Sequence, residues 1–273
     1  MGLKRLPFGR FRPIGDGHHW GPMAEGDTIL RAARRLDAAL GGETVAASAP
    51  SPRGRAAGIE RLDGHRLEAV ESHGKNLLLR FDDLVLHSHL GMNGSWHVYP
   101  RGGPWRKPRR SAWAVLAGER QEAVQFGGPT LRLIPATRLA RDPQLARLGP
   151  DILAPDFDPA TVVAAIRAEP ARTLGDVLLD QTLVAGIGNI FKSEACFAAR
   201  VDPWRPVADL GDDELRAVLR AAREQMLRAV DGGRHTYAVY KARRPCPVCR
   251  GRIAFRGQGD ANRTTYWCPR CQG

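Results

Sequence analysis

The stretch DQTLVAGIGNIFKSEACFAARVDP, residues 180–203, decides how this chain is expected to fold. Apolar residues follow helical spacing on both sides of Gly186 and Gly188, and the two glycines permit a tight turn between two helices. The turn exposes backbone amides at the start of the second helix and adds the side-chain donor Asn189, which suits an anion such as a DNA phosphate. Taken alone, the Gly-x-Gly pattern has an alternative interpretation as an ordinary corner between two helices, with Asn189 as a cap and no bound anion.

The sequence changes character on either side of this corner. Helical periodicity begins at Asp158-Pro159, where proline suits a first helical position, and continues to about Val230 with breaks at 185–188 and 202–206. Upstream, the stretch 45–135 consists of short apolar runs separated by turns, which indicates a β-sandwich or a barrel.

A single helix is predicted before these strands, over residues 28–40. Asp27 or Thr28 is expected to cap its start, and Gly41-Gly42 to end it. The segment YPRGGPWRKPRR, residues 99–110, is a basic, proline-rich connection between two of the predicted strands. A solvated loop is the plain interpretation of this segment, and contact with phosphates is the other.

Composition narrows the class of partner. The chain of 273 residues has a formal net charge of +12 and a pI near 10.2, which favours a polyanion such as nucleic acid. A basic membrane-surface protein would require a long amphipathic basic helix, which the sequence lacks. Neither a membrane-spanning apolar run nor a signal-peptide core is present, so a cytosolic, nucleoid-associated protein is expected.

Four of the five cysteines form two CxxC pairs close to the end of the sequence. Cys246 and Cys249 are separated by eighteen residues from Cys268 and Cys271, a spacing typical of a structural zinc site, and the residues between them indicate a β-hairpin. Disulfides are not expected in a reducing compartment. The fifth, Cys196, is interpreted as a small buried apolar residue within a helix.

Four segments resemble, in the same order along the chain, the signatures of the formamidopyrimidine-DNA glycosylase and endonuclease VIII family. They are MAEGD at 23–27, SHGKNLLL with HLGMNG at 72–94, the glycine turn at 180–203, and RTTYWC at 263–268. The resemblance covers about residues 23–273. It implies an N-terminal β-sandwich with a flanking helix at 23–140, a helix-two-turn-helix domain at 150–232 and a zinc-finger β-hairpin at 240–273. Residues 1–22 are then a disordered extension or a mis-called start.

The resemblance also implies an activity, namely removal of a damaged base followed by cleavage of the DNA strand. Ala24 stands where the family has an N-terminal proline whose amine attacks the sugar, so the chain would have to begin functionally at Met23. Glu25 matches the general acid/base, Lys75 a lysine of β-elimination and phosphate contact, and Arg263 the finger-tip arginine that binds phosphate and acts in δ-elimination.

Further matches concern how DNA is held. Met92 matches a residue that fills the gap left by the flipped nucleotide, and Asn189 a DNA-binding side chain. The arginine of a second wedge is missing near Phe126, which is predicted to substitute for it in part. The segment before Cys246 is too short for a loop that caps purines. Both features place the chain closer to endonuclease VIII, with oxidised pyrimidines or abasic sites in double-stranded DNA as substrates.

Other functions remain open from the sequence. A non-catalytic, zinc-stabilised protein that binds damaged DNA would keep Asn189 and Arg263 but need no free amine at Ala24. A monofunctional glycosylase and an RNA-associated zinc-ribbon protein are further alternatives. A monomer with one structural Zn²⁺ is expected, and the balance of β- and β,δ-elimination is not determined.

Overall fold

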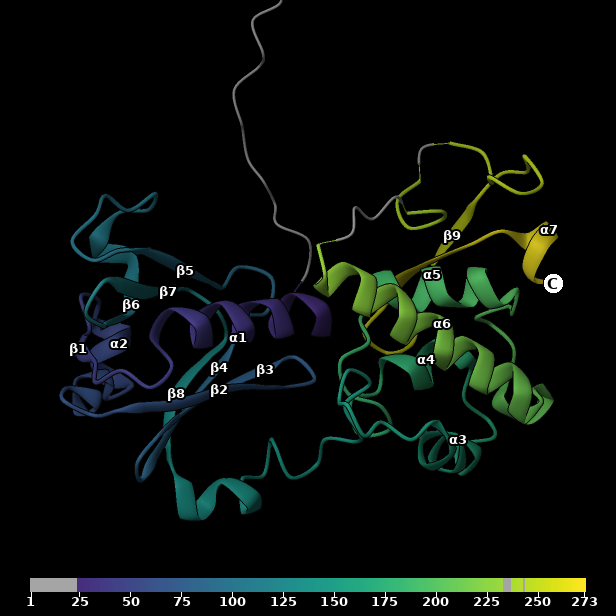
Figure 1. The fold of residues 1–273 in the computed structure, drawn as a ribbon. Coiled ribbons are helices and arrows are strands. Elements are labelled where there is room, and N and C mark those ends of the chain that lie inside the picture. Colours follow the sequence, from purple (N-terminus) through teal and green to yellow (C-terminus); the bar gives the residue numbers. More distant parts are fainter. Residues whose placement is uncertain (1–23, 233–236, 243) are drawn as a thin grey trace, which may run out of the picture.

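The computed structural model describes residues 24–232, 237–242 and 244–273. The predicted extension at 1–22 lies outside them. Figure 1 shows two lobes side by side, a β-rich lobe in purple to teal and a helical lobe in green, with a yellow hairpin packed on the helical lobe. Within the described residues, no helix has the length and apolar character needed to cross a membrane.

Two four-stranded antiparallel sheets form the β-rich lobe, as the predicted sandwich requires. One sheet has the order β2-β3-β4-β8 and the other β1-β6-β7-β5. The strands are β1 (Ala46–Ser48), β2 (Leu67–His73), β3 (Asn76–Phe81), β4 (Leu84–His89), β5 (Ser95–Pro100), β6 (Ala112–Ala117), β7 (Gln121–Phe126) and β8 (Thr130–Pro135). A short helix, α2 (Pro52–Ala56), and three 3-10 turns, η1 (Ile59–Leu62), η2 (Arg109–Ser111) and η3 (Ala136–Arg141), complete the lobe.

Helix α1 (Gly26–Leu40) flanks the sheets and packs its apolar stripe into their core. Ile29, Leu36 and Leu40 on α1 are almost fully buried together with the strand residues Leu77 and Leu79. The helix ends at Gly41 as predicted. The prediction that Asp27 or Thr28 caps the start of the helix was wrong.

The residue that precedes α1 in extended conformation is Glu25, and no side chain caps the helix. Asp27 and Thr28 therefore lie within the first turn. The reason is a contact from the other lobe, since the amide of Gly26 donates to the Gly186 carbonyl at 2.9 Å and helical structure begins at this residue.

The helical lobe contains α3 (Pro159–Arg167), α4 (Leu174–Leu179), α5 (Asn189–Ala199) and α6 (Asp212–Val230), with the turn η4 (Val207–Asp209) before α6. Helix α3 begins at Pro159 as predicted, and Asp158 caps it, because its carboxylate accepts the amides of Ala160 and Thr161. Cys196 is fully buried in α5, which confirms its interpretation as a core residue. The glycine turn lies between α4 and α5.

The cysteine-rich region forms the predicted hairpin of β9 (Ala254–Gln258) and β10 (Arg263–Trp267), followed by α7 (Pro269–Gln272). The hairpin packs on α5. Lys192 of α5 is fully buried, and its ammonium donates to the Thr265 hydroxyl at 2.6 Å and to Gln258 Oε1 at 3.4 Å. The orientation of the finger is thus tied to the helix that starts at the glycine turn.

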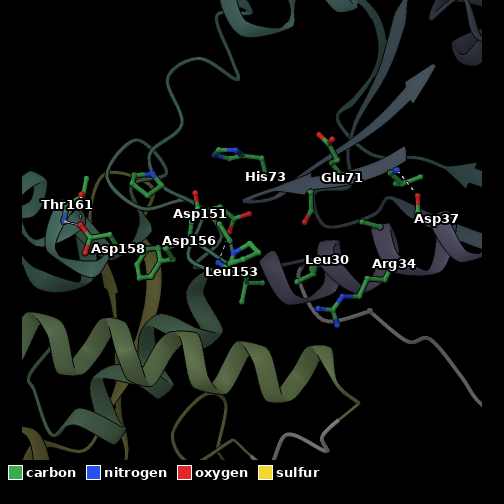
Figure 2. A pocket seen from close by; sticks show the side chains of 17 residues that line it. Leu30, Arg34, Asp37, Glu71, His73, Asp151, Leu153, Asp156, Asp158 and Thr161 are labelled. Atoms are coloured by element: carbon green, nitrogen blue, oxygen red, sulfur yellow. Dashed lines mark hydrogen bonds between the residues drawn. The ribbon is translucent and has the colours of Figure 1, made fainter. Parts of the chain in front are cut away.

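The junction between the lobes is held by the linker that follows the β-rich lobe. The amide of Gly74, in the β2–β3 turn, donates to Asp151 Oδ2 at 2.9 Å, and a ring nitrogen of His73 lies 3.1 Å from the Gly149 carbonyl. Figure 2 shows His73 and Asp151 beside a hollow of about 690 Å³ that also borders α1. The turn that precedes Lys75 is therefore fastened to the helical lobe.

Candidate active site

A pocket of about 250 Å³ lies where the two lobes and the finger meet. Every residue that the sequence assigned to catalysis or DNA binding lines it: Ala24, Glu25, Lys75, Met92, Asn189 and Arg263. The other lining residues are His89, Gly91, Leu179, Gly188 and Ala261. Segments more than two hundred positions apart in the chain thus contribute to a single site.

Glu25 is the centre of this site and is 1% exposed. One carboxylate oxygen accepts the amide of Ile190 at 2.8 Å, and the other accepts those of Gly188 and Phe191 at 3.0 and 3.3 Å. The amides at the start of α5 therefore hold a carboxylate of the chain itself. The expectation that they bind a DNA phosphate was wrong, because Glu25 already occupies the positive end of the helix.

The lack of a side chain at Gly188 makes this contact possible. A Cβ at this position would lie 2.2 Å from Glu25 Cδ. The glycine at this turn therefore allows the start of α5 to lie directly against Glu25, in front of α1.

The protonation of the pocket is set by burial. Burial raises the pKa of Glu25 from 4.5 to about 7, although the nearby Lys75 and the amides of Ile190 and Phe191 lower it. Burial lowers the pKa of Lys75 from 10.5 to about 8, opposed by Glu25 and reinforced by Arg263. Near neutral pH Glu25 is thus poised between its two forms, as a group that both gives and takes a proton must be.

Lys75 owes its place to the tight β2–β3 turn. Gly74 has a φ of +56°, which favours glycine, and a Cβ there would meet the Ala185 side chain at 2.8 Å. Asp151 holds the Gly74 amide while its second oxygen accepts the amide of Leu153 at 2.9 Å. Asp151 is a residue that the sequence analysis missed, and no local pattern marked it.

Met92 lies in the β4–β5 turn and is 66% exposed, an unusual state for a large apolar side chain. This exposure suits a residue that inserts into DNA. Phe126 does not share that property, because it is only 3% exposed and packs against Tyr99 and Val124. The prediction that Phe126 substitutes in part for a second wedge was wrong.

Asn189 and Arg263 both line the pocket. The Asn189 amide nitrogen donates to the Thr264 carbonyl at 2.7 Å, directly after Arg263 on β10. Asn189 is thus already engaged with the finger hairpin, and Arg263 is exposed beside the pocket. This bond and the buried Lys192 both fix the hairpin against α5.

The sulfur atoms of Cys246, Cys249, Cys268 and Cys271 all lie within 4.8 Å of one another. The Cys246–Cys271 and Cys249–Cys268 sulfur pairs are 3.8 and 3.5 Å apart. A tetrahedral Zn²⁺ with Zn–S bonds of about 2.3 Å needs sulfurs about 3.8 Å apart, so the cluster fits a metal ion of this size.

Comparisons with known proteins agree with this geometry. The sequence model of the formamidopyrimidine-DNA glycosylase N-terminal domain matches residues 23–129, and that of the family's H2TH domain matches 148–240. A protein from Streptomyces coelicolor named "Probable endonuclease 8 2" is 39% identical, over 92% of this chain and 94% of its own.

The chain belongs to the formamidopyrimidine-DNA glycosylase and endonuclease VIII family.

Two further similarities support this assignment. "DNA-(apurinic or apyrimidinic site) lyase Nei2" from Mycolicibacterium smegmatis is 35% identical over 92% of this chain and 99% of its own. The crystal structure of a Lactococcus lactis formamidopyrimidine-DNA glycosylase bound non-covalently to DNA with an AP site has the same fold, with a TM-score of 0.77 at 23% identity over 91% and 99% of the two chains. The endonuclease 8 names fit the predicted side of the family.

Within this family pocket, His89 is a lining residue to which the sequence analysis gave no role. It ends β4 and precedes the Met92 turn. Burial lowers its pKa, and Lys75 lowers it further, so the ring is neutral beside the charged lysine. The apolar run that begins β4 predicted a strand but did not indicate that the strand's last residue faces the site.

Proposed function

We propose that this chain is a bifunctional DNA glycosylase and AP lyase of base-excision repair. The observation that carries this proposal is the convergence of Ala24, Glu25 and Lys75 on one pocket in which the pKa of Glu25 is about 7. A carboxyl group that is half protonated at neutral pH can protonate a leaving group and later accept a proton.

The nucleophile of the proposed reaction is the α-amine of Ala24. An α-amine has a pKa near 7.7–8.0, so a useful fraction is neutral at pH 7. We propose that the reactive form begins at Ala24 after removal of Met23, since an amide nitrogen would not attack the sugar. The match to the family's N-terminal domain starts at residue 23, which supports this start.

The proposed steps follow from the geometry. The neutral amine attacks C1′ of the flipped nucleotide, the damaged base leaves, and loss of a proton gives an imine between Ala24 and the opened sugar. Glu25 supplies a proton to the departing base or the ring oxygen and takes one back in the imine step. A proton is then removed from C2′, a C2′–C3′ double bond forms, and the C3′–O bond breaks, so the 3′-phosphate leaves and the strand is cut.

Lys75 and Arg263 are proposed to bind the phosphates beside the lesion, because both cations line the pocket next to Glu25. Asn189 orients the hairpin that presents Arg263 and adds a polar edge to the pocket. Met92 is proposed to fill the gap left in the base stack, as its exposure next to the pocket allows.

The preferred substrate is proposed to be double-stranded DNA with an oxidised pyrimidine or an abasic site. The endonuclease 8 names of the relatives and the burial of Phe126 support this class, because a second wedge is not available at that position. A monomer suffices for the proposed chemistry, since one chain supplies all the lining residues.

The four cysteines are proposed to hold one structural Zn²⁺. The metal would fix the hairpin that carries Arg263, and would take no part in the reaction. The spacing of the four sulfurs and the bond from the Gly251 amide to Cys249 Sγ at 3.4 Å support a thiolate site.

Borohydride trapping on a duplex with an abasic site tests the function. Two forms of the protein, one starting at Met1 and one at Met23, would be compared after mass determination of each N-terminus. We expect a covalent adduct on Ala24 only from the form that starts at Met23. An adduct from both forms, with the N-terminus of the long form intact, would move the nucleophile to a lysine, Lys75 first. No adduct and no base release from either would refute the proposed activity.

A further inference from the structure

The basic connection between β5 and β6 does not line the active-site pocket. It carries Arg101, Arg106, Lys107, Arg109 and Arg110, and residues 101–111 contain no acidic side chain. Figure 1 shows this connection at the upper left of the β-rich lobe, next to the labels of β5 and β6. A solvated loop of this composition would have little reason for a fixed structure.

Aromatic packing nevertheless holds the connection against the sheet. The Trp105 ring stacks on Tyr99 at 6.2 Å between centroids and meets the edge of Phe126 at the same distance. The Trp105 indole N–H donates to Glu122, and the Arg106 amide donates to the Tyr99 hydroxyl at 3.2 Å. The loop is therefore anchored through its centre.

The anchoring side chains present the charges outward. Arg109 lies over the Trp105 ring at 4.1 Å, and the Lys107 ammonium donates to the Ser95 hydroxyl at 3.0 Å. Arg106, Arg109 and Arg110 are exposed. A stacked arginine is partly ordered before it meets a phosphate, which lowers the entropy cost of binding.

This surface adjoins the DNA-inserting turn. Lys107 lines a hollow of about 570 Å³ together with Arg31, and Ala24 and Met92 border both this hollow and the catalytic pocket. Met92 therefore stands between two hollows, with Arg263 on one side and Lys107 on the other. The electrostatic potential around His97, which also lines this hollow, is positive. Burial lowers the pKa of His97 to about 4, and the charges of Lys107, Arg106 and Arg35 contribute to the decrease.

We propose that residues 101–110 form a second phosphate clamp, which binds the backbone of the DNA duplex on the side of Met92 away from the zinc finger. The proposal rests on the proposed DNA-repair function and adds a contact that the catalytic pocket does not provide. Arg106, Arg109 and Arg110 are its exposed cations, and Trp105 sets the position of the loop. The finger and this clamp would thus hold the two duplex arms that flank the lesion.

The test uses Arg106→Gln with Arg110→Gln, which leaves the catalytic pocket and the Trp105 packing unchanged. Binding is measured on a duplex with a tetrahydrofuran abasic analogue, which cannot form an imine. Because the variant cannot bind these two phosphates, its affinity for the duplex should fall about tenfold near physiological salt. A plot of the logarithm of the association constant against the logarithm of the salt concentration should have a slope less negative by about 2. A matched control is Arg138→Gln with Arg141→Gln, which removes the same charge from the exposed 3-10 turn η3 at the bottom of Figure 1.

Shortened duplexes locate the contact. Two duplexes would be cut to about three base pairs on one side or the other of the analogue. The clamp predicts that the variant's loss of affinity disappears with one truncation and persists with the other, while the control variant binds like the parent throughout. An equal loss from both variants, a loss that neither truncation removes, or no loss would overturn the clamp. A parent protein that fails to bind the duplex at all would refute the proposed function as well.

Discussion

At the scale of single residues, Glu25 combines two opposing demands. It is almost fully buried, which favours the neutral acid, and it accepts three backbone amides, which favour the carboxylate. Burial is the larger effect, so the pKa rises to about 7. The amides hold the side chain in place in either protonation state, because even the neutral carboxyl keeps oxygen acceptors.

Replacement of Glu25 by Gln should abolish base excision and keep DNA binding. The amide side chain has no acidic proton to give, while Lys75 and Arg263, the proposed phosphate ligands, remain. A loss of at least a hundredfold in the single-turnover rate of base release is expected from removal of a general acid. Affinity for the tetrahydrofuran duplex serves as the control. Near-normal base release would contradict the role of Glu25.

The pH dependence follows from the same group. If protonated Glu25 and the neutral Ala24 amine are both required, the rate of base release should follow a bell-shaped pH profile. It should fall above pH 7 as Glu25 loses its proton, and fall at lower pH as the amine becomes protonated. The raised pKa also means that the folded state binds this proton more tightly than the unfolded state. The stabilisation is therefore present below pH 4.5 and is lost as the pH rises from 4.5 through 7.

Chemical denaturation at several pH values measures this effect. Between pH 5 and 7 the free energy of unfolding of the parent should decrease relative to that of Glu25→Gln, since the variant has no carboxyl to ionise. Parallel curves for the two proteins would show that the pKa of Glu25 is not raised.

The six site residues predicted from the sequence all line one pocket, because each belongs to a short segment with a recognisable pattern. It did not predict what holds Glu25. The Gly188 amide lies 163 positions away, and a pattern of local spacing carries no information about such a contact. The same limit hid Asp151, which acts on the turn before Lys75 from 77 positions away.

At the scale of elements, the start of α5 is the part on which the site depends most. Its Gly188 N-cap lies in extended backbone and leaves room for Glu25, while the Asn189 and Lys192 side chains hold the finger. One helix therefore positions both Glu25 and the hairpin that carries Arg263.

Gly188→Ala should impair catalysis although it removes no functional group. The new Cβ would lie 2.2 Å from Glu25 Cδ and would displace the carboxylate from the amides. Gly211→Ala is the matched control, since Gly211 is the N-cap of α6 and its Cβ would have only Glu214 Oε2 nearby, at 3.7 Å. Base-release rates and melting temperatures of both variants would be compared. Equal rates would argue against the steric explanation.

Cys268→Ser should release the metal and loosen the finger. Cys268 is fully buried in the small core of the hairpin region, so loss of its ligand removes a constraint that this region cannot replace. Metal content by mass spectrometry and affinity for the tetrahydrofuran duplex would both fall. A variant that keeps one metal ion per chain and full affinity would rule out the four-cysteine site.

At the scale of the whole molecule, the two lobes are joined by polar contacts close to the active site. Gly26 donates to Gly186, Gly74 to Asp151, and the α5 amides to Glu25. The boundary between the lobes can be placed from the change in sequence periodicity. In each of these contacts at least one partner is a backbone group. Almost every residue has such groups, so the sequence does not mark which of them pair across the interface.

Asp151→Ala should have a larger effect on the rate of strand cleavage than on the stability of the parts of the fold that lie away from the site. Without the carboxylate, the Gly74 amide loses its acceptor and the turn before Lys75 becomes less ordered. The rate of β-elimination on a preformed abasic site should fall, with a smaller change for Asp158→Ala, which removes only the cap of α3. If both variants cleave at the same rate as the parent, the linker does not position Lys75.

The contact between Glu25 and α5 also has a bearing on genome safety. A protein that detaches bases from DNA is a hazard if it reacts before its folding is complete. When the lobes are apart, Glu25 is hydrated and its pKa returns toward 4.5, so at neutral pH the carboxyl has already lost its proton. Packing of the two lobes therefore raises the pKa of Glu25 to about 7, so a copy in which they are not packed together holds much less of the protonated acid at neutral pH.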